Sequence, residues 1–566
     1  MSEQKEIISN KAIARIFRLT SQLMELHEEN PFKIRSMQNA SFKIERIADP
    51  LAGMNEQEIA SLEGIGKSIA QKISCIVSGV PFAELDELTT KTPEGVMDML
   101  SIKGLGPKKV SALWRGLGIE STGELLYACN ENRLIELKGF GAKTQDQIRS
   151  AIEYTLANKG KFHYATVEVA AMQLLQDLES LPFCIQSSFT GALRRRCEIL
   201  DKAEILISVT SKETLISFLN SHTLFEKDSL KSETDKIIIH SAQSIPFEIY
   251  LCQENEFDIR LFETTGSESH LQWLNTAFPS IQLNGNSEEE IYHSVGLPWF
   301  HPEFREGMFE SDWLSRGNNL PEPVEYADLK GILHNHTTYS DGIHSLEEMA
   351  LYCKSMGYEY LGVCDHSQSA FYANGLKPER VLQQHEEIDR LNKQLAPFVI
   401  FKGIESDILI DGSLDYGQDL LEQFDFIVAS VHSVLRMDAA KATARLIKAI
   451  EHPKTTILGH PTGRLLLARE GYPLDMVKIL DACAANNVIM ELNANPYRLD
   501  LDWRFLPMAL EKGVKISINP DAHRKEGYHD MHYGVCVARK GGLTKEMTFN
   551  AMSTSLIATH FKNKRA

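Results

Sequence analysis

Short apolar runs alternate with amphipathic helical stretches over the C-terminal part of the chain, from about residue 325 to residue 566. Seven of the runs are of β type. Strand and helix alternating at this spacing predict a parallel sheet, and about seven units indicate a sheet that closes into a barrel. The runs are LKGILHNH, YLGVCDHS, FVIFKGIESD, DFIVASVHS, TTILGHPTG, NVIMELNAN and VKISINPDAH.

The first third of the chain contains three copies of one pattern, LEGIGK, IKGLGP and LKGFGA, each followed by an amphipathic helix. A helix end that meets Gly-x-Gly before a second helix is the helix-hairpin-helix pattern. Free amides at the start of the second helix can bind a nucleic-acid phosphate without reading bases. The alternative is that some copies only pack against neighbouring helices. The glycines concerned are Gly64, Gly66, Gly104, Gly106, Gly139 and Gly141.

The middle of the chain, from about residue 165, has the β-rich runs EILISV, KIIIHS and PFEIYLC with helices between them, which predict a small α/β domain. The stretch GLPWFHPEFREGMFE follows. A connection rich in Pro, Gly and Asn, RGNNLPEPVEYADLKG, then indicates a major boundary near residue 323.

Composition narrows the class of protein. A chain of 566 residues is too long for one core and suggests several units of about 100 to 200 residues. No apolar run is long enough to span a bilayer, and MSEQKEIISN lacks an apolar signal core, so we expect a cytoplasmic protein without membrane contact. The nine cysteines, such as Cys75, Cys364 and Cys483, are expected to be reduced core thiols. A net charge of −18 argues against a basic coat for nonspecific DNA binding.

Nine side chains that can bind metals stand at the ends of six of the seven β-type runs. Alternate residues of a strand face the same way, so the spacing of His334 and His336 directs both rings into one site. Active sites of such barrels lie at the C-terminal strand ends, where these side chains should converge. One such histidine would more often be structural, but nine at successive strand ends indicate a site. They are His334, His336, Asp341, His366, Glu405, His432, His460, Asp521 and His523.

Nine ligands exceed the needs of one tetrahedral ion and indicate two or three divalent cations. Imidazoles mixed with carboxylates suit Zn, Mn or Fe better than Mg. Such a cluster lowers the pKa of bound water and neutralises charge on a phosphate, so the predicted reaction is phosphoester hydrolysis. Arg464 and Arg524 follow His460 and His523 and are candidate catalytic phosphate clamps, or partners of a neighbouring carboxylate.

The arrangement HNHTTYSDG, DHS, GIES, SVHS, GHPTGR and DAHR resembles the PHP (polymerase and histidinol phosphatase) family. The resemblance covers residues 325 to 566 and implies a distorted (β/α)7 barrel whose trinuclear metal site uses all nine side chains. With the hairpins, the α/β unit and GLPWFHPEFREG in this order, the whole chain resembles the bacterial family X DNA polymerases, PolX, which join a polymerase core to a 3′ to 5′ exonuclease. The segments NPFKIR and TGSESH also match that family.

The polymerase centre departs from the family pattern. Nucleotidyl transfer needs three carboxylates that hold two Mg²⁺ ions. By alignment with the family's segment GSxRRGxxxxxDxD, Lys202 and Glu204 stand where the two aspartates belong, and Glu248 at the third position. The phosphate turn Gly-Ser has become Gly191-Ala192, and Glu263-Thr264 replaces an aromatic pair. We therefore expect templated polymerisation, and Mg²⁺ binding there, to be weak or absent; a shift to Asp201 would turn that side chain to the wrong face.

Lys72 matches the position of the Schiff-base lysine that removes a 5′ deoxyribose phosphate in the family's repair members. A buried or cation-flanked lysine can act as a nucleophile, whereas a solvated helix lysine would not.

The expected architecture is multidomain. It comprises a helical DNA-end-binding domain (1–85), a fingers-like helical region with two hairpins (86–160), a degenerate palm-like nucleotidyltransferase domain (161–255), a thumb-like domain and linker (256–322), and the PHP barrel (323–566).

The leading hypothesis is a DNA-repair phosphoesterase, a monomer that processes gapped DNA or 3′ ends. The alternatives are an active gap-filling polymerase with exonuclease, a small-molecule phosphatase of the histidinol phosphatase type, and a DNA-binding scaffold.

Overall fold

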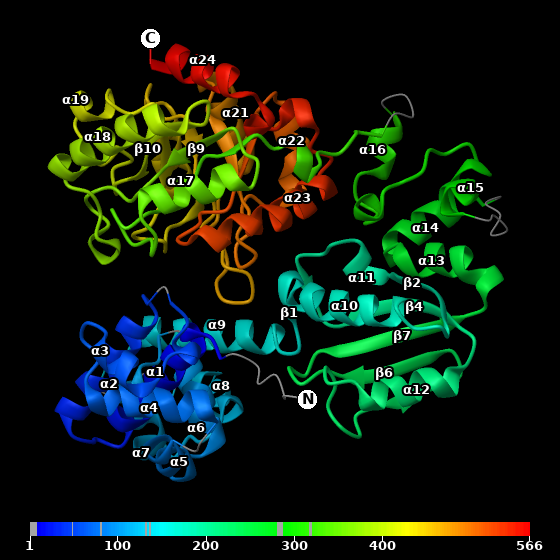
Figure 1. Cartoon of the computed structure of the whole chain (residues 1–566), viewed down its shortest axis with the longest axis horizontal. Helices are drawn as coiled ribbons and strands as arrows, with labels where there is room; N and C mark the ends of the chain where they lie inside the picture. Colours follow the sequence, from blue (N-terminus) through cyan, green and yellow to red (C-terminus); the bar gives the residue numbers. More distant parts are fainter. Residues whose placement is uncertain are drawn as a thin grey trace. The chain divides into compact units, whose positions relative to one another are not determined.

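The computed structural model describes residues 8–565 apart from 48, 80–81, 103, 131–132, 135–136, 138, 280–286 and 316–319. The chain divides into two compact units, Met1–Lys159 and Gly160–Ala566, and each is described by itself (Figure 1). No helix within the described ranges combines the length and the apolarity needed to cross a membrane. All nine cysteines lie in these ranges as free thiols, five of them buried.

The first unit is entirely helical within the described residues. Two of its helices end at left-handed glycines, Gly79 and Gly118, and the side chains of Ser9 and Asn30 cap the start of the first two helices. One apolar core joins the helices, with Phe17, Val110 and Leu125 fully buried. The helices are α1 (Asn10–Leu26), α2 (Pro31–Ile44), α3 (Glu56–Ser61), α4 (Lys67–Ser78), α5 (Ala83–Thr90), α6 (Glu94–Ser101), α7 (Pro107–Leu117), α8 (Thr122–Asn130) and α9 (Ala142–Ala157).

The three Gly-x-Gly turns are built alike. The first glycine of each has a positive φ, +78° at Gly64 and +93° at Gly104 and Gly139, which is why an L side chain is disfavoured there. The second glycine of each turn is the extended N-cap of α4, α7 or α9. The predicted hairpins are therefore confirmed at α3–α4 and α6–α7. The motif residues Lys103 and Lys138 lie outside the described residues.

The second unit begins with a five-stranded sheet in the order β2-β4-β7-β6-β5. β4 and β7 run parallel, and the other neighbours are antiparallel. Alternate residues of β4 face opposite ways: Ile205 and Ile207 pack with α10 and α12, whereas Leu206 packs with α13. The elements are α10 (Tyr164–Glu179), β2 (Cys184–Phe189), α11 (Gly191–Arg194), β4 (Ala203–Val209), α12 (Lys212–Ser221), β5 (Lys231–Ser232), β6 (Lys236–His240) and β7 (Pro246–Cys252), with a short antiparallel pair β1 (Phe162–His163) and β3 (Ile199–Leu200).

A small helical part with an aromatic core follows the sheet. Tyr292, Phe300 and Phe304 are fully buried there, and Trp313 packs on Phe304 with ring centroids 4.6 Å apart. The motif GLPWFHPEFREG thus supplies much of this core. The helices are α13 (Phe257–Thr265), α14 (Glu268–Ala277), α15 (Glu288–His293) and α16 (Glu310–Ser315).

The C-terminal part is a seven-stranded parallel sheet in the order β14-β13-β12-β11-β10-β9-β8, which is the predicted barrel. The strands are β8 (Gly331–Ile332), β9 (Tyr360–Val363), β10 (Val399–Asp407), β11 (Phe426–Ser430), β12 (Ile457–Leu458), β13 (Ile489–Asn493) and β14 (Ile516–Asn519). The surrounding helices are α17 (Leu346–Ser355), α18 (Pro378–Leu395), α19 (Gln418–Leu421), α20 (Ala439–Ile450), α21 (Met476–Asn486), α22 (Leu506–Glu511), α23 (Met531–Lys540) and α24 (Thr554–Arg565) (Figure 1).

The barrel is nearly closed. β8 and β14 do not form a ladder, but an isolated bridge joins Asn335 to Ala522 just beyond them. The side-chain amide of Asn550 donates to the carbonyls of Gly331 (3.0 Å) and Ile518 (2.7 Å) and so joins the two end strands. The closure is therefore incomplete, in keeping with the distorted barrel that the family resemblance implies.

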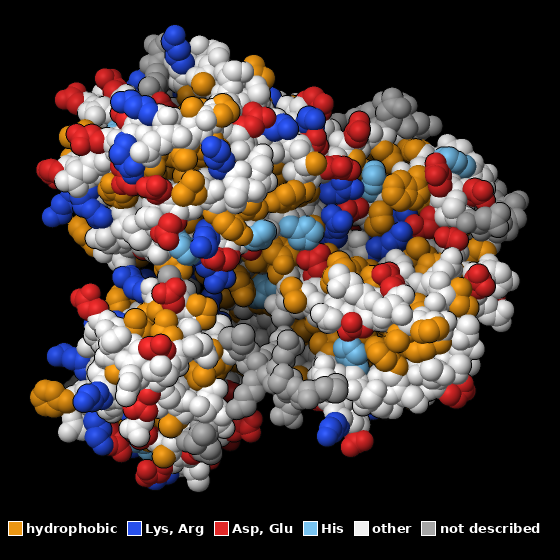
Figure 2. All heavy atoms as spheres, in the orientation of Figure 1, with side chains coloured by type: hydrophobic (Ala, Val, Ile, Leu, Met, Phe, Trp, Pro, Cys, Tyr) orange, Lys and Arg blue, Asp and Glu red, His pale blue; other side chains and the backbone are white. Residues whose placement is uncertain are grey.

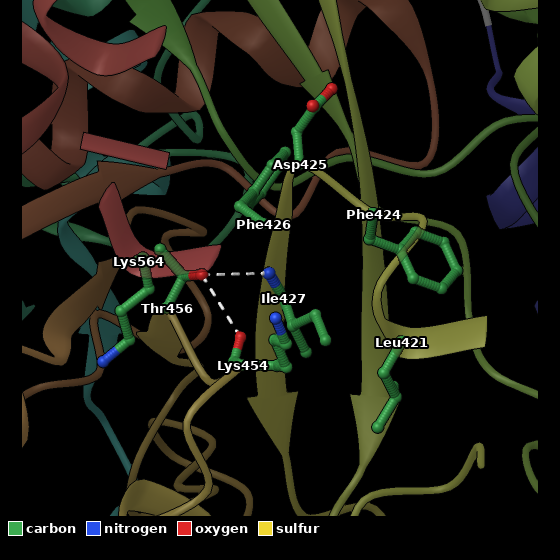
Figure 3. Close-up of a pocket in the computed structure, with 8 residues that line it drawn as sticks. All are labelled: Leu421, Phe424, Asp425, Phe426, Ile427, Lys454, Thr456 and Lys564. Atoms are coloured by element: carbon green, nitrogen blue, oxygen red, sulfur yellow. Dashed lines mark hydrogen bonds between the residues drawn. The ribbon is translucent and has the colours of Figure 1, made fainter. Parts of the chain in front are cut away.

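The N-terminal end of the barrel is filled. Phe561 of α24 stacks on Phe426 with ring centroids 4.9 Å apart. Beside it, Thr456 Oγ1 accepts from Ile427 N (3.2 Å) and donates to Lys454 O (3.4 Å), and the cavity left there measures only about 10 Å³ (Figure 3). A space of that size holds no more than one water. The open, ligand-bearing end is therefore the opposite one.

Buried ion pairs join the five-stranded sheet part, the aromatic part and the barrel. Glu306 bonds the Arg195 guanidinium (3.1 Å) and also pairs with Lys540 of α23. Glu303 pairs with Arg196 (3.3 Å) and with Arg539 of α23 (2.8 Å). The arginines of GALRRR therefore hold the parts of the second unit together.

Candidate metal centre

The nine predicted ligands all lie at the C-terminal ends of barrel strands and face one another. Eight of the nine form three overlapping groups, and within each group one ligand atom of every residue lies within 4.8 Å of the others. The groups are His336, Asp341, His366 and His523; His334, His336 and Asp521; and His366, Glu405 and His432. His460 joins them because its Nε2 lies 3.0 Å from Glu405 Oε1. The tertiary structure thus brings all nine together.

The donor atoms fit cations better than they fit one another. Five of them are buried and form no hydrogen bond of good geometry, although His366 Nδ1 and Glu405 Oε2 lie 2.9 Å apart: His334 Nε2, His336 Nδ1, His366 Nδ1, His460 Nδ1 and Glu405 Oε2. A buried polar atom without a partner destabilises a fold by about 1–3 kcal/mol. Five such atoms around one space are the arrangement that bound metal ions would satisfy.

The charges of the site favour a positive occupant. Burial would raise the pKa of Glu405, but His432, His334 and other histidines lower it well below its usual value. Burial would lower the pKa of His432, but Glu405 and Asp407 raise it to about 10. The carboxylates therefore favour a protonated His432 when no cation is present, whereas burial and the neighbouring His523 and His366 lower the pKa of His336 to about 3. Metal binding must displace the proton of His432, since a ligating imidazole is neutral.

Two buried carboxylates behind the ligands were missed by the sequence reasoning. Glu491 of β13 accepts from His334 Nδ1 at 2.7 Å and from the backbone N–H of His460 at 2.7 Å. Asp407 bonds His432 Nδ1. Such partners fix the ring tautomer so that the other nitrogen faces the metal. The only signal for Glu491 was a charged residue inside the apolar run NVIMELNAN.

A third carboxylate orders the loop that carries the first ligands. Asp365, fully buried, accepts from the backbone N–H of Thr337 (2.8 Å) and Ser340 (3.1 Å) and from the side-chain amide of Gln384 (2.6 Å). Its burial raises its pKa. This network fixes the segment between His336 and Asp341.

Two ligands have strained backbones. Asp521 has φ +52° and His460 has φ +22°. Non-glycine residues rarely adopt positive φ, and such conformations cluster at functional sites where surrounding contacts impose them. The bonds of Asp521 to His336 (2.9 Å) and Asn493 (3.1 Å) help to impose it here.

The two predicted phosphate clamps are placed differently. The Arg464 guanidinium is engaged by Asp502 and by the carbonyls of Arg498 (3.0 Å) and Leu499, which is the alternative that the sequence left open. Arg524 is exposed and forms no ion pair with any described residue. Arg498, not singled out from the sequence, has its Nε 3.9 Å from Asp521 Oδ2.

The opening of the site also carries aromatic side chains. The Tyr372 ring lies 6.1 Å from the His366 ring, and 64% of this tyrosine is exposed. The adjacent Phe371 is 87% exposed. Elsewhere, on the face drawn in Figure 2, acidic and basic side chains are interspersed without a continuous basic field, in line with the net charge of −18.

At the positions where the sequence predicts a degenerate polymerase site, Lys202 occupies the space between the two glutamates. Its ammonium lies 2.9 Å from Glu248 Oε2 and 3.1 Å from Glu204 Oε1. Glu204 and Glu248 are register partners on β4 and β7, and Tyr250 donates to Glu248 at 2.7 Å. Burial would lower the pKa of Lys202, but Glu248 and Glu204 raise it. An internal cation thus neutralises this carboxylate pair.

The phosphate turn of that site is also occupied from within the chain. Gly191 has φ +58°, and a Cβ built on it would lie 1.9 Å from Glu204 Oε2. The same oxygen accepts from the backbone N–H of Ala192 at 3.0 Å. Glu204 therefore bonds the amide at the start of α11 that an anion would otherwise use.

Lys72 is mostly buried and is paired with a carboxylate. Its ammonium pairs with Glu84 and lies 5.0 Å from the Phe82 ring centroid, with 16% of the side chain exposed. It is thus a mostly buried lysine with a carboxylate partner.

Comparisons with known proteins agree with this architecture. A helix-hairpin-helix domain family matches residues 8–79, and a SAM-like helix-hairpin-helix tandem matches residues 96–153. The DNA polymerase/3'-5' exonuclease PolX of Bacillus subtilis is 33% identical over 572 residues, which cover 98% of this chain and 99% of that protein.

Phosphatases resemble the C-terminal part alone. A probable phosphatase of Thermoanaerobacter sp. is 26% identical over 243 residues, covering 41% of this chain and 94% of the relative. Another, from Caldicellulosiruptor saccharolyticus, is 26% identical over 207 residues, covering 34% and 79%. The shared hairpins, the barrel and the similarity over nearly the whole length lead to one assignment: the chain belongs to the PolX family of bacterial family X DNA polymerases, and its barrel is of the PHP type.

Proposed function

We propose that this protein binds DNA and hydrolyses phosphoesters at 3′ ends, as a 3′ to 5′ exonuclease or a 3′ end-processing enzyme in DNA repair. The observation that carries the proposal is the group of five unsatisfied donor atoms among nine converging ligands at the open end of the barrel. The hairpins of the first unit supply the grip on a polymer that a small-molecule phosphatase would not need. The relative from Bacillus subtilis bears the name of such an exonuclease.

The nine residues at the strand ends would hold two or three divalent cations, with Mn, Zn or Fe favoured by the mixture of imidazole and carboxylate. When bound, such ions supply a nucleophile near neutral pH and charge stabilisation for the phosphate. Glu491 and Asp407 orient the rings of His334 and His432 by accepting from Nδ1. Exposed Phe371 and Tyr372 offer aromatic faces on which a base could stack.

Of the two candidate clamps, Arg524 is available for a substrate phosphate, whereas Arg464 holds residues 498–502 in place. We propose Arg524 as a phosphate contact and Arg464 as a positioning residue. Arg498 is a further cation close to Asp521.

We propose in addition that templated polymerisation is weak or absent and that Mg²⁺ binds the palm-like site poorly. The position of Lys202 between Glu204 and Glu248 supports this, because an ammonium there repels the cations that the reaction requires. The pairing of Lys72 with Glu84 gives a lyase role little support, and borohydride trapping with an abasic-site DNA tests that role.

The five domains predicted from the sequence remain proposals, as do gapped DNA as a substrate, a monomeric state and a cytoplasmic location. The separate cores of residues 160–566 are in keeping with boundaries near residues 255 and 322.

One gel tests the proposal. A 5′-labelled primer-template is incubated with Mn²⁺, with and without deoxynucleotides, and with wild type or the His334→Ala, His336→Ala variant. We expect shortening by wild type only, and no lengthening. Lengthening would favour the gap-filling polymerase. Inertness toward DNA, together with hydrolysis of histidinol phosphate, would favour the small-molecule phosphatase, a reading that the related probable phosphatases keep open.

A further inference from the structure

A groove lies beside the metal centre, between the segments that follow β10 and β11. It encloses about 580 Å³, the size of a small-ligand pocket. One wall includes Ile410 and Asp411, beyond Glu405, and the other includes Val434 and Arg436, beyond His432. In parallel barrels the segments after the strands form the substrate site, and both walls of the groove come from segments that follow strands carrying or preceding metal ligands.

Arg445 of α20 joins the two walls. Its guanidinium, 4% exposed as a whole residue, donates to the carbonyls of Ser433 (3.0 Å), Leu409 (2.8 Å) and Ile408. It therefore ties both segments to one anchor and adds a positive charge that is bonded to no carboxylate of the described residues. Asp407, which bonds His432, directly precedes Ile408, so the same anchor also supports the metal centre.

The groove is positively charged in a protein whose net charge is −18. Four cationic side chains and two carboxylates line it. Lys448 pairs with Asp411 at 2.9 Å, and Lys441 lies 3.2 Å from Asp438 with 80% of its side chain exposed. Exposed pairs of that kind contribute little, so Lys441 can exchange its partner for a phosphate. Arg436 is exposed and has no ion-pair partner among the described residues.

Apolar side chains stand between these cations. Ile410 is 72% exposed and Val434 is 51% exposed. Val434 has φ +53°, a conformation that a β-branched residue rarely adopts. Alternating cationic and apolar contacts suit a nucleic-acid strand, which presents phosphates and base or sugar faces in turn.

We propose, on the basis of the proposed function, that this groove binds the strand whose 3′ end is being hydrolysed. Arg436 and Lys441 contact backbone phosphates upstream of the scissile bond, and Ile410 and Val434 contact the intervening bases or sugars. The groove then makes the enzyme prefer a polymer to a mononucleotide ester.

The test compares Arg436→Ala, Lys441→Ala with the charge-matched control Lys393→Ala, Lys562→Ala, whose residues are exposed and lie away from the groove. The substrate is a single-stranded oligonucleotide in Mn²⁺. For the groove variant we expect KM to rise about tenfold, equivalent to about 1.4 kcal/mol, with kcat nearly constant. The slope of log KM against log salt should fall by about 1.4, since each phosphate contact on a single strand contributes about 0.7.

Two further measurements keep the outcomes distinct. The rate on bis(p-nitrophenyl) phosphate, which is too short to reach the groove, reports whether the metal centre is intact. Ile410→Asp, which adds a negative charge to the wall, should raise the oligonucleotide KM in the same way. A groove variant with the KM and salt slope of the control would overturn the proposal.

The groove proposal would also be overturned if the groove variant lost inhibition by a deoxynucleoside monophosphate without a change in its oligonucleotide KM. The groove would then hold the released nucleotide. A wild-type protein that cleaves the small diester but shortens no DNA would overturn the proposed function itself, and the groove proposal with it.

Discussion

Glu491 Oε1 lies 2.7 Å from His334 Nδ1, although 157 positions separate the two residues in the chain. Both side chains are fully buried. The contact leaves His334 Nε2 directed at the other ligands without a hydrogen-bond partner. A residue from the one strand that supplies no predicted ligand thus orients the first ligand of the site.

Replacing Glu491 should therefore weaken metal binding without removing a ligand. Partners of this kind typically change metal affinity or activity by about 10–100-fold. We expect a loss of metal affinity of about tenfold for Glu491→Gln, because an amide oxygen can still accept a hydrogen bond, and of about 100-fold for Glu491→Ala. Metal content by elemental analysis and exonuclease rate are the measurements. Glu379→Gln, on the exposed side of α18, is the control, and equal metal content in all proteins would contradict the assignment.

The variant His334→Ala, His336→Ala should lose more than about 100-fold in hydrolysis, because it removes two proposed ligands rather than their partners. DNA affinity should remain within about twofold if the hairpins of the first unit supply most of the grip. Anisotropy with labelled DNA measures the affinity, and a chelator applied to wild type should reproduce the loss. A parallel loss of affinity and hydrolysis would place DNA binding in the barrel instead.

Lys202→Met should destabilise the protein, because Glu204 and Glu248 would then face each other as like charges. Breaking a buried ion pair costs about 3–5 kcal/mol, and since 29% of the Lys202 side chain is exposed we expect about 1–2 kcal/mol. Urea unfolding measures this. Adding Glu248→Gln should recover part of the loss, and additive effects of the two changes would show that the pair does not interact.

The acid stability of the second unit should depend on Glu306. Burial would raise the pKa of this residue, but Lys540 and Arg195 lower it to about 2 from an ordinary value of 4.5. The unfolded state then binds more protons in this window, so stability is present above pH 4.5 and is lost as the pH falls toward 2.

A shift of this size corresponds to about 3 kcal/mol. Glu306→Gln should be less stable at pH 7 and should lose less stability between pH 4.5 and 2 than wild type. Fluorescence-monitored unfolding across that range is the measurement. An unchanged pH dependence would show that Glu306 is not the titrating group.

Serine at the second glycine of each hairpin separates DNA contact from folding. Gly66, Gly106 and Gly141 have open space around a built Cβ, and serine is a favoured N-cap, so stability should hold. The serine hydroxyl would occupy the helix amides that a phosphate needs. Each hairpin that contacts duplex DNA should then lose DNA affinity at constant salt, with the salt slope nearly unchanged because no Lys or Arg is removed. If all three variants bind DNA as wild type does, the hairpins serve packing alone.

Much of the fold followed from local patterns. The seven β-type runs became β8 to β14 in chain order because strand-helix alternation with right-handed crossovers leaves few other arrangements. The Gly-x-Gly turns could be predicted because glycine readily adopts a positive φ, which Gly64, Gly104 and Gly139 have in the structure. The residues that replace the polymerase aspartates were identified by alignment with the family's pattern.

Contacts between distant segments were beyond such patterns. In the sequence Glu491 is only a charged residue within an apolar run. Its contact with His334 forms because β13 lies beside β14 in the barrel. Arg464 and Arg524 each come shortly after a histidine ligand, and the sequence does not distinguish them. In the structure Asp502 pairs with Arg464, whereas Arg524 is exposed. The groove of Arg436 and Lys441 depends on Arg445 joining two loops.

By itself, the sequence determined which side chains can bind metal and that they stand at strand ends, because periodicity and residue chemistry are local properties. The tertiary structure decided which of their atoms face one another, which buried carboxylates support them, and that Lys202 neutralises its glutamates. Those outcomes depend on distances between side chains on different strands. These distances are fixed only when the strands have assembled into the barrel and the sheet.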